Sequence, residues 1–210
     1  MAAKRGITLY HSPASRAFIA YWMLEELGVP FDVQTVDIAK GEQKDPRYLK
    51  INPSGKVPAL TDGAATVSET PAICIFLADR YGYGTLAPRI EDPRRGEYLR
   101  WMVYAASVLD PVAELHSRAI DLPGGATGFG TYDDMVRVLE TALSRHEYIA
   151  GDAFTAADVA LGGGLSMLLY NRKLPESPAL LDYNARLAAR PACQRAADAT
   201  WPAQLFPPAG

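Results

Sequence analysis

The strongest constraint on the fold is a change of pattern along the chain. Short strand-like runs alternate with helix-like runs up to about residue 82, and strand signals then fade. Strands are predicted over 7–10, 31–38, 57–61 and 65–68, and helices over 15–27, within 39–50 and over 71–81. The order β-α-β-α-β-β-α predicts a four-stranded mixed sheet with helices packed on it, because a βαβ unit gives parallel neighbours and the last two strands form a hairpin.

The remainder of the chain reads as helical. Helices are predicted over 94–120, 132–148, 156–170, 179–189 and 192–199, with a glycine-rich loop over 124–130 and an irregular tail over 202–210. A chain of 210 residues can form two small domains. We therefore predict an α/β domain over 1–82, a linker over 83–93 and an all-helical domain over 94–210.

Composition argues against several classes of protein. Lys and Arg number 21 against 24 Asp and Glu, a balance that does not favour a general nucleic-acid binder. No apolar run approaches the ~18 residues of a membrane span, and the first residues lack the apolar region of a secretion signal. Cys74 and Cys193 form no CxxC motif, so a disulfide scaffold, a cysteine zinc site and a dithiol redox motif are not expected. We expect a soluble, cytoplasmic protein without a metal.

Ser12 stands at the first junction between a strand and a helix. It has two interpretations: a helix N-cap with proline at the next position, or a hydroxyl that faces an anion beside a helix N-terminus. Ser15 competes for either role. A nucleophilic serine is disfavoured, because the chain has no GxSxG motif. The histidines are expected to be ordinary surface or interface residues; they are His11, His116 and His146.

Ser68-Glu69-Thr70-Pro71 forms a second junction of the same kind. Thr70 could be the helix N-cap. Alternatively, Glu69 could bind a ligand ammonium, while Thr70 and free backbone N–H groups bind a ligand carboxylate. In Lys56-Val57-Pro58 the proline suits an edge strand, and spacing alone does not favour a cis bond.

These motifs together resemble the glutathione transferase superfamily, in a bacterial, serine-type form. The resemblance spans nearly the whole chain. The segments that carry it are Leu9-Tyr10-His11-Ser12-Pro13-Ala14-Ser15-Arg16, Asn52-Pro53-Ser54-Gly55-Lys56-Val57-Pro58-Ala59-Leu60, Ser68-Glu69-Thr70-Pro71-Ala72-Ile73, Gly151-Asp152-Ala153-Phe154-Thr155-Ala156-Ala157-Asp158 and Arg190-Pro191. Thr155 to Asp158 also reads as a helix capping box.

The resemblance implies a thioredoxin-like N-terminal domain that binds glutathione, a helical-bundle C-terminal domain, and a homodimer. It implies that Ser12 hydrogen-bonds the glutathione sulfur, with Ser15 and Tyr10 as alternatives. The cysteine and histidine of many bacterial members fall at Arg16 and Asp110 here, so a mixed-disulfide mechanism is disfavoured.

The resemblance also implies roles for the residues that hold the rest of glutathione. Val57 would pair with the cysteinyl part through its backbone, beside a cis Pro58. Glu69 and Thr70 would hold the γ-glutamyl ammonium and carboxylate. The groups that would face the glycyl carboxylate are Lys56 and Gln43 or Lys44.

The expected reaction is attack of the glutathione thiolate on a small hydrophobic electrophile, with glutathione as co-substrate. Tyr104, Val108 and His116 are predicted to line the electrophile site between the domains, because helical spacing places the first two near one face. Two alternatives stay open. One is a glutathione-dependent disulfide reductase or peroxidase, and the other is a binding protein of the same fold without chemistry.

Overall fold

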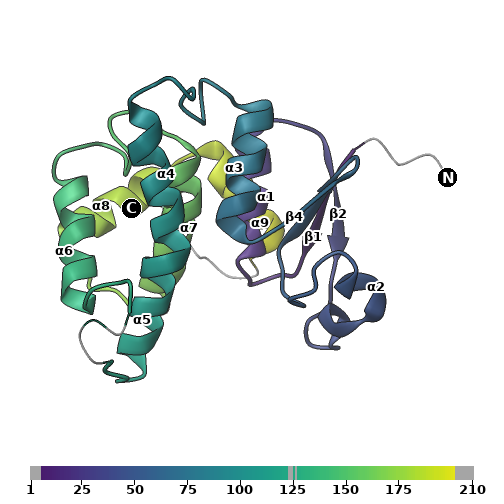
Figure 1. Ribbon diagram of the computed structural model, residues 1–210, viewed down its shortest axis with the longest axis horizontal. Helices are drawn as coiled ribbons and strands as arrows, with labels where there is room; N and C mark the ends of the chain where they lie inside the picture. The colour runs from purple at the N-terminus through teal and green to yellow at the C-terminus, as the bar shows by residue number, and fades with distance from the viewer. Residues whose placement is uncertain (1–5, 123–124, 126, 202–210) are drawn as a thin grey trace.

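The computed structural model describes residues 6–122, 125 and 127–201 and divides into two lobes (Figure 1). One lobe holds the sheet with the first helices. The other holds the later helices side by side. The predicted irregular tail lies outside the described residues.

The sheet has four strands in the order β2-β1-β3-β4. They are β1 (Ile7–His11), β2 (Phe31–Thr35), β3 (Ala59–Asp62) and β4 (Ala65–Ser68). β1 pairs with β2 in parallel, whereas the β1–β3 and β3–β4 pairs are antiparallel. The predicted four-stranded mixed sheet is therefore confirmed.

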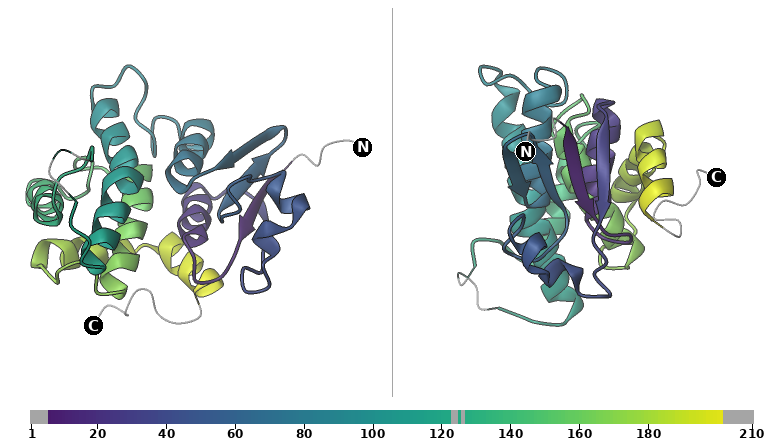
Figure 2. Two further views of the ribbon diagram at one scale, coloured as in Figure 1. Left: turned by 60° about the horizontal axis from the view of Figure 1, so that its bottom comes forward. Right: turned by 90° about the vertical axis from the view of Figure 1, so that its right-hand side faces the viewer.

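Helices cover both faces of the sheet. α1 (Ala17–Leu27) and α3 (Thr70–Tyr81) pack on one face, on the side of the later helices (Figure 2). The short η1 (Glu42–Lys44) and α2 (Pro46–Leu49) precede the turn that leads into β3. β2 is shorter than predicted, because the Asp37 carboxylate accepts the Ala39 and Lys40 amides and turns the chain away.

The helical lobe contains a long helix that was predicted to be continuous over 94–120. It is interrupted in the middle by a π-helical turn. The segments of this helix are α4 (Arg94–Tyr104), η2 (Ala105–Leu109) and α5 (Asp110–Ser117). The helices that follow are α6 (Tyr132–Leu143), α7 (Ala156–Tyr170), α8 (Pro178–Ala188) and α9 (Pro191–Thr200). Pro111 explains the interruption: it has no N–H for the usual helical bond, and its ring needs extra room in the preceding turn.

The helix predicted over 132–148 ends earlier, at Leu143. There the Ser144 hydroxyl donates to the Thr141 carbonyl. Such local side-chain hydrogen bonds compete with the backbone hydrogen bonds that would continue the helix. No helix within the described residues is long and apolar enough to cross a membrane.

α7 lies at the centre of the core and has the predicted bounds. Its predicted capping box is present. The Thr155 hydroxyl accepts a backbone N–H of the first turn, and the Asp158 carboxylate accepts the backbone N–H of Thr155. Two glycines allow close packing. A Cβ at Gly163 would come within 2.7 Å of Ile19 on α1, and one at Gly162 within 2.2 Å of Leu187 on α8. A side chain at either position would push these helices apart.

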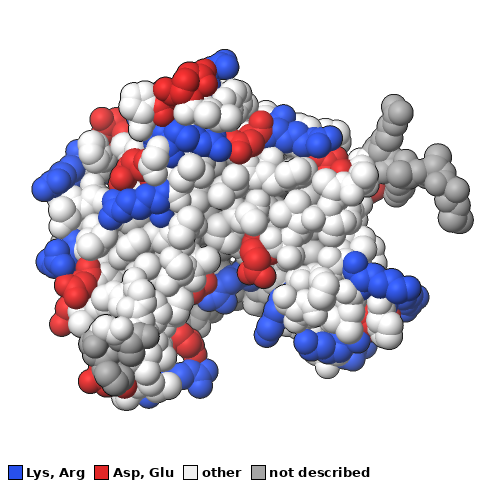
Figure 3. Space-filling model, viewed as in Figure 1, with Lys and Arg blue, Asp and Glu red and all other residues white. Residues whose placement is uncertain are grey.

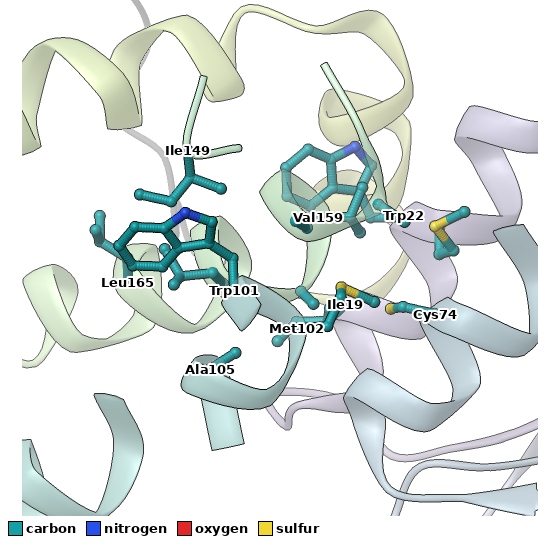
Figure 4. Close-up of a cluster of buried hydrophobic side chains, with 14 of the residues drawn as sticks. Ile19, Trp22, Cys74, Trp101, Met102, Ala105, Ile149, Val159 and Leu165 are labelled. Atoms are coloured by element: carbon teal, nitrogen blue, oxygen red, sulfur yellow. The ribbon is translucent and has the colours of Figure 1, made fainter. Parts of the chain in front are cut away.

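One hydrophobic cluster extends through both lobes. It joins the α1 and α3 side chains to those of α4 and α7, including Trp22, Cys74, Trp101 and Val159 (Figure 4). The two predicted domains, over 1–82 and 94–210, therefore share one hydrophobic core. Their boundaries and the linker over 83–93 stay a prediction.

Candidate active site

Ser12 lies in a tight turn between β1 and α1. The Ser15 hydroxyl donates to the Ser12 carbonyl (2.6 Å) and accepts from the Ala17 amide (3.2 Å). The helix begins only at Ala17, with Arg16 as its N-cap, so the interpretation of Ser12 as an N-cap is wrong. Ala14 has a left-handed φ of 53°, which prevents the helix from starting earlier.

The Ser12 hydroxyl is available for a ligand. The residue is only 3% exposed, and within the described part of the chain its hydroxyl has no hydrogen-bond partner. The Ser15 hydroxyl, in contrast, already donates its proton. Of the two serines, Ser12 therefore has the free donor.

Tyr10 and His11 point to opposite faces of the sheet. The Tyr10 ring packs on Tyr48 of α2, with 5.8 Å between ring centres, whereas His11 meets Tyr21 of α1 edge-on. His11 is buried, its Nε2 has no partner among the described residues, and burial lowers its pKa. The expectation of an ordinary surface or interface residue is wrong for His11, because strand alternation directs this ring toward α1 and into the interior. His116 and His146 are exposed.

The turn before β3 is fixed by bonds to one carbonyl. The Lys56 carbonyl accepts the Tyr48 hydroxyl (2.5 Å) and the Asn52 amide (2.8 Å). The peptide between Val57 and Pro58 is cis, as the resemblance implies. The Lys56 side chain is exposed, with its ammonium toward solvent. Lys56 therefore holds the turn through its backbone carbonyl and not through its side chain.

Lys44 approaches this turn from η1. Its ammonium donates to the Ser54 carbonyl (3.3 Å). Gly55, with φ of 60°, leaves room for it, because a Cβ there would be 2.5 Å from Lys44 Nζ. The Gln43 Oε1 atom is buried nearby in the chain without a partner among the described residues. The structure thus brings Lys44 beside the turn that carries Lys56.

Glu69 is the N-cap of α3, and Thr70 and Pro71 are its first residues. The interpretation of Thr70 as the N-cap is therefore wrong. Glu69 has φ of 69°, a conformation that costs a residue with a side chain about 1–3 kcal/mol and occurs most often at functional sites. Its side chain is exposed beside the free N–H groups of the helix start, a favourable place for an anion.

The predicted electrophile-site residues separate into two places. Tyr104, at the end of α4, and Val108, in η2, are half-buried against the core, and burial raises the pKa of Tyr104. His116 instead stacks on Tyr132 at 3.6 Å and lines a cavity of about 380 Å³ at the end of α5. None of the predicted glutathione-binding residues lines that cavity.

A contact that sequence analysis missed joins the two lobes. Arg16 Nε donates to Asp110 Oδ2 over 2.8 Å, linking the Ser12 turn to the start of α5. The sequence marked both positions as departures from the bacterial pattern but gave no signal that they pair. The molecular surface is hollowed between the end of the helical lobe that carries α5 and the part that carries α2 (Figure 3). Within the described residues, no group of His, Cys, Asp and Glu side chains is suited to a metal ion.

The chain is similar to known glutathione transferases in both sequence and structure. A family model described as "Glutathione S-transferase, N-terminal domain" matches residues 15–80. Glutathione S-transferase F10 of Arabidopsis thaliana is 34% identical over 169 residues, covering 73% of this chain and 77% of that protein. Glutathione S-transferase 3 of Schizosaccharomyces pombe is 31% identical over 171 residues, covering 72% and 70%.

Solved structures give the same result. A glutathione transferase family member from Pseudomonas fluorescens, with two glutathione bound, has a TM-score of 0.77 and 25% identity, covering 91% of this chain and 92% of that one. The theta class glutathione S-transferase of Xanthomonas axonopodis pv. citri, with glutathione bound, has a TM-score of 0.72 and 28% identity, covering 91% and 97%.

Proposed function

The chain belongs to the glutathione transferase superfamily, and from this premise we propose that it transfers the glutathione thiolate to a small hydrophobic electrophile. The observation that carries the proposal is the Ser12 hydroxyl. The residue is largely buried, its hydroxyl has no partner among the described residues, and it lies in the turn between the end of β1 and the start of α1. A free donor in this place suits a bound sulfur anion.

The energetics of this arrangement are sufficient. A thiol has a pKa near ~8.5, and lowering it by ~2 units requires roughly 2.7 kcal/mol of preference for the thiolate. One hydrogen bond to a charged group supplies about 1.5–3 kcal/mol, and a helix N-terminus adds about 0.3–1 kcal/mol. Ser12 with the start of α1 can therefore hold a thiolate near neutral pH without a general base. Holding both substrates together supplies the remaining rate gain.

The tripeptide would lie across the turns that surround Ser12. Glu69, exposed at the start of α3, is suited to the γ-glutamyl ammonium, and Thr70 with the free amides of that helix to its carboxylate. The Val57 backbone would pair with the cysteinyl part beside the cis Pro58. Lys44 and Lys56 would face the glycyl carboxylate.

The second substrate would lie toward the helical lobe. Tyr104 and Val108 supply half-buried apolar surface there. His116 lies apart from this surface, because it lines the cavity at the end of α5.

A homodimer is proposed on the exposed apolar surface of α4. Leu99 and Val103, one helical turn apart, are 37% and 60% exposed. α3 packs beside α4 and adds the half-buried Ile75 and Phe76. Such a patch is typical of a protein–protein contact.

The function is tested by measuring turnover of benzyl chloride with glutathione, together with glutathione binding by calorimetry. Saturable conjugation supports the proposal. Binding without conjugation, accompanied by reduction of a mixed disulfide or a hydroperoxide, would favour the reductase or peroxidase alternative. Glu69→Ala should weaken binding, and full affinity in that variant would contradict the assignment of the pocket.

A further inference from the structure

A second cavity, of about 310 Å³, lies between α4 and α6 in the helical lobe. None of the residues proposed to hold glutathione lines it, so it is separate from the candidate active site. Three arginines contribute to its wall: Arg100 from α4, Arg137 from α6 and Arg145 from the turn after α6. Among the described residues, Glu97 is the one carboxylate in this wall. A cavity of this volume is in the range of small-molecule sites.

The wall also contains a buried hydrogen-bond donor without an acceptor. Trp101 is 0% exposed, and within the described part of the chain its indole N–H has no partner. Figure 4 shows the indole nitrogen on the edge of the ring nearest Ile149, and both residues line the cavity. The Trp22 indole N–H, in contrast, is bound to the Glu26 carboxylate. An unpaired buried donor destabilises a protein, so the Trp101 N–H calls for an acceptor that the described residues do not supply.

The arginines of the wall have donors and charge to spare. Arg100 binds Glu97 through one nitrogen (2.6 Å), and Arg137 binds Asp134 through one nitrogen (2.7 Å). The Arg145 guanidinium has no partner among the described residues. Each of the two pairs is neutral as a whole, so the charge of Arg145 lacks a counter-ion. The unused N–H groups of all three side chains remain available to a ligand.

These donors define the chemistry of the ligand. Guanidinium and indole N–H groups donate and do not accept, so the ligand must supply acceptor oxygens. The unpaired Arg145 favours a negative charge on them. His146, the other titratable group of the wall, contacts the Asp152 carboxylate (3.1 Å). Asp152 is 80% exposed and does not line the cavity, so water and salt screen its charge. Phosphate oxygens match the planar fork of a guanidinium.

We propose that the cavity between α4 and α6 binds a phosphate group, either as the free anion or as the head of a phosphate ester. One phosphate oxygen accepts the Trp101 indole N–H, and the others accept from Arg145 and from the unused N–H groups of Arg100 and Arg137. The Arg100 guanidinium, which lies 4.3 Å from the centre of the Trp101 ring, is placed to donate beside the indole. The proposed dimer contact lies on another face of α4, because helical spacing separates its residues from Arg100 and Trp101.

The test follows the tryptophan indole N–H groups by nitrogen–proton NMR while inorganic phosphate replaces chloride at constant ionic strength. Phosphate should shift the Trp101 resonance saturably, and Trp101→Phe identifies that resonance. The Trp22 resonance should stay in place, because its N–H is already bound to Glu26. Calorimetry gives the affinity. A stronger response to phenyl phosphate than to inorganic phosphate would identify an ester as the ligand, and an equal response the free anion.

Arg145→Gln should weaken phosphate binding about tenfold, because it removes a hydrogen bond between charged groups. Arg172→Gln is the matched control. Arg172 is also exposed and without a side-chain partner among the described residues, but it does not line the cavity. Conjugation of benzyl chloride should stay unchanged in Arg145→Gln, so this inference and the proposed function can fail separately.

Three outcomes would overturn the inference. The first is a Trp101 resonance that does not move at millimolar phosphate. The second is a shift that chloride reproduces at the same ionic strength, which would make it a general salt effect. The third is an equal loss of affinity in Arg145→Gln and Arg172→Gln, which would assign binding to overall surface charge. Calorimetry of these two exposed-site variants decides the question even if Trp101→Phe fails to fold.

Discussion

The Arg190 guanidinium binds the Glu26 carboxylate through two parallel hydrogen bonds, of 2.6 and 2.8 Å, and so fastens the start of α9 to the end of α1. The carboxylate also accepts the Trp22 indole N–H, and the guanidinium lies 3.4 Å from the centre of the Phe154 ring. Glu26 is 8% exposed and Arg190 28%. The pair is therefore largely removed from solvent, where an unpaired charge is costly.

Glu26→Ala should lower the free energy of unfolding by about 2–4 kcal/mol, because it leaves Arg190 and the Trp22 indole without their acceptor. Urea unfolding measures the change. Arg195→Ala is a suitable control, because Arg195 makes a more exposed pair with Glu25 and should cost less than about 1 kcal/mol. Equal effects of the two substitutions would contradict this explanation.

The buried His11 should make stability depend on pH. Burial lowers its pKa, so the folded protein keeps the ring neutral, whereas the unfolded chain takes up a proton near pH 6.5. The stability is therefore complete above about pH 6.5 and is lost as the pH falls toward the folded pKa, by at most about 1.4 kcal/mol per pH unit. In urea unfolding between about pH 7.5 and 5, His11→Phe should show a shallower loss than wild type. His146→Gln, at an exposed site, is the control. Parallel curves for wild type and His11→Phe would refute the role of His11.

Ser12→Ala should lower kcat roughly 10- to 100-fold, the loss that follows from removing one hydrogen bond to a charged group. The pKa read from the pH–rate profile should rise, because the bound thiolate loses its donor. Glutathione affinity should change little, since the proposed pocket would hold the rest of the tripeptide through other residues. Stopped-flow pH profiles and calorimetry check both points. An unchanged pH profile would exclude Ser12 as the sulfur partner.

The sheet and most helices follow from local signals in the sequence. The capping box at Thr155 and Asp158 fixes the start of α7, and its bounds were predicted in full. The start of α1 was not predicted correctly, because it depends on the left-handed backbone of Ala14 and on the Ser15 hydroxyl, which accepts the first helical N–H. Proline at position 111 gave a clue to the π-helical turn that the apolar periodicity concealed.

The candidate site was predictable where it depends on short motifs, and less so where it depends on tertiary contacts. The turns at Ser12, Lys56 and Glu69 are local in sequence, and the roles proposed for them come from the resemblance. The pair formed by Arg16 and Asp110 joins residues 94 positions apart, a distance that no local pattern spans. Burial of a polar side chain such as His11 likewise depends on what packs on its strand, which spacing alone does not give.

Gly55→Ala should weaken glutathione binding several-fold. The new Cβ would lie 2.5 Å from Lys44 Nζ and 2.9 Å from the Gln43 carbonyl, so η1 must move away from the turn that carries Lys56. Gly63→Ala is a matched control: it has the same φ of 60°, but its Cβ meets nothing within 4 Å. Both variants should lose about 1 kcal/mol of stability from the left-handed backbone. Calorimetry should show a loss of affinity for Gly55→Ala alone, and equal affinities would contradict a role for this contact.

Val103→Glu should convert the proposed dimer into monomers. Val103 is 60% exposed on α4, and Leu99 lies one turn before it on the same face, so a charge at position 103 would be buried without a partner in a contact between two copies. Leu181→Glu places the same charge at an exposed leucine of α8, away from this face, and should leave the assembly unchanged. Sedimentation velocity separates the two states. A dimer that survives Val103→Glu, or one that Leu181→Glu dissociates instead, would move the contact elsewhere on the molecule.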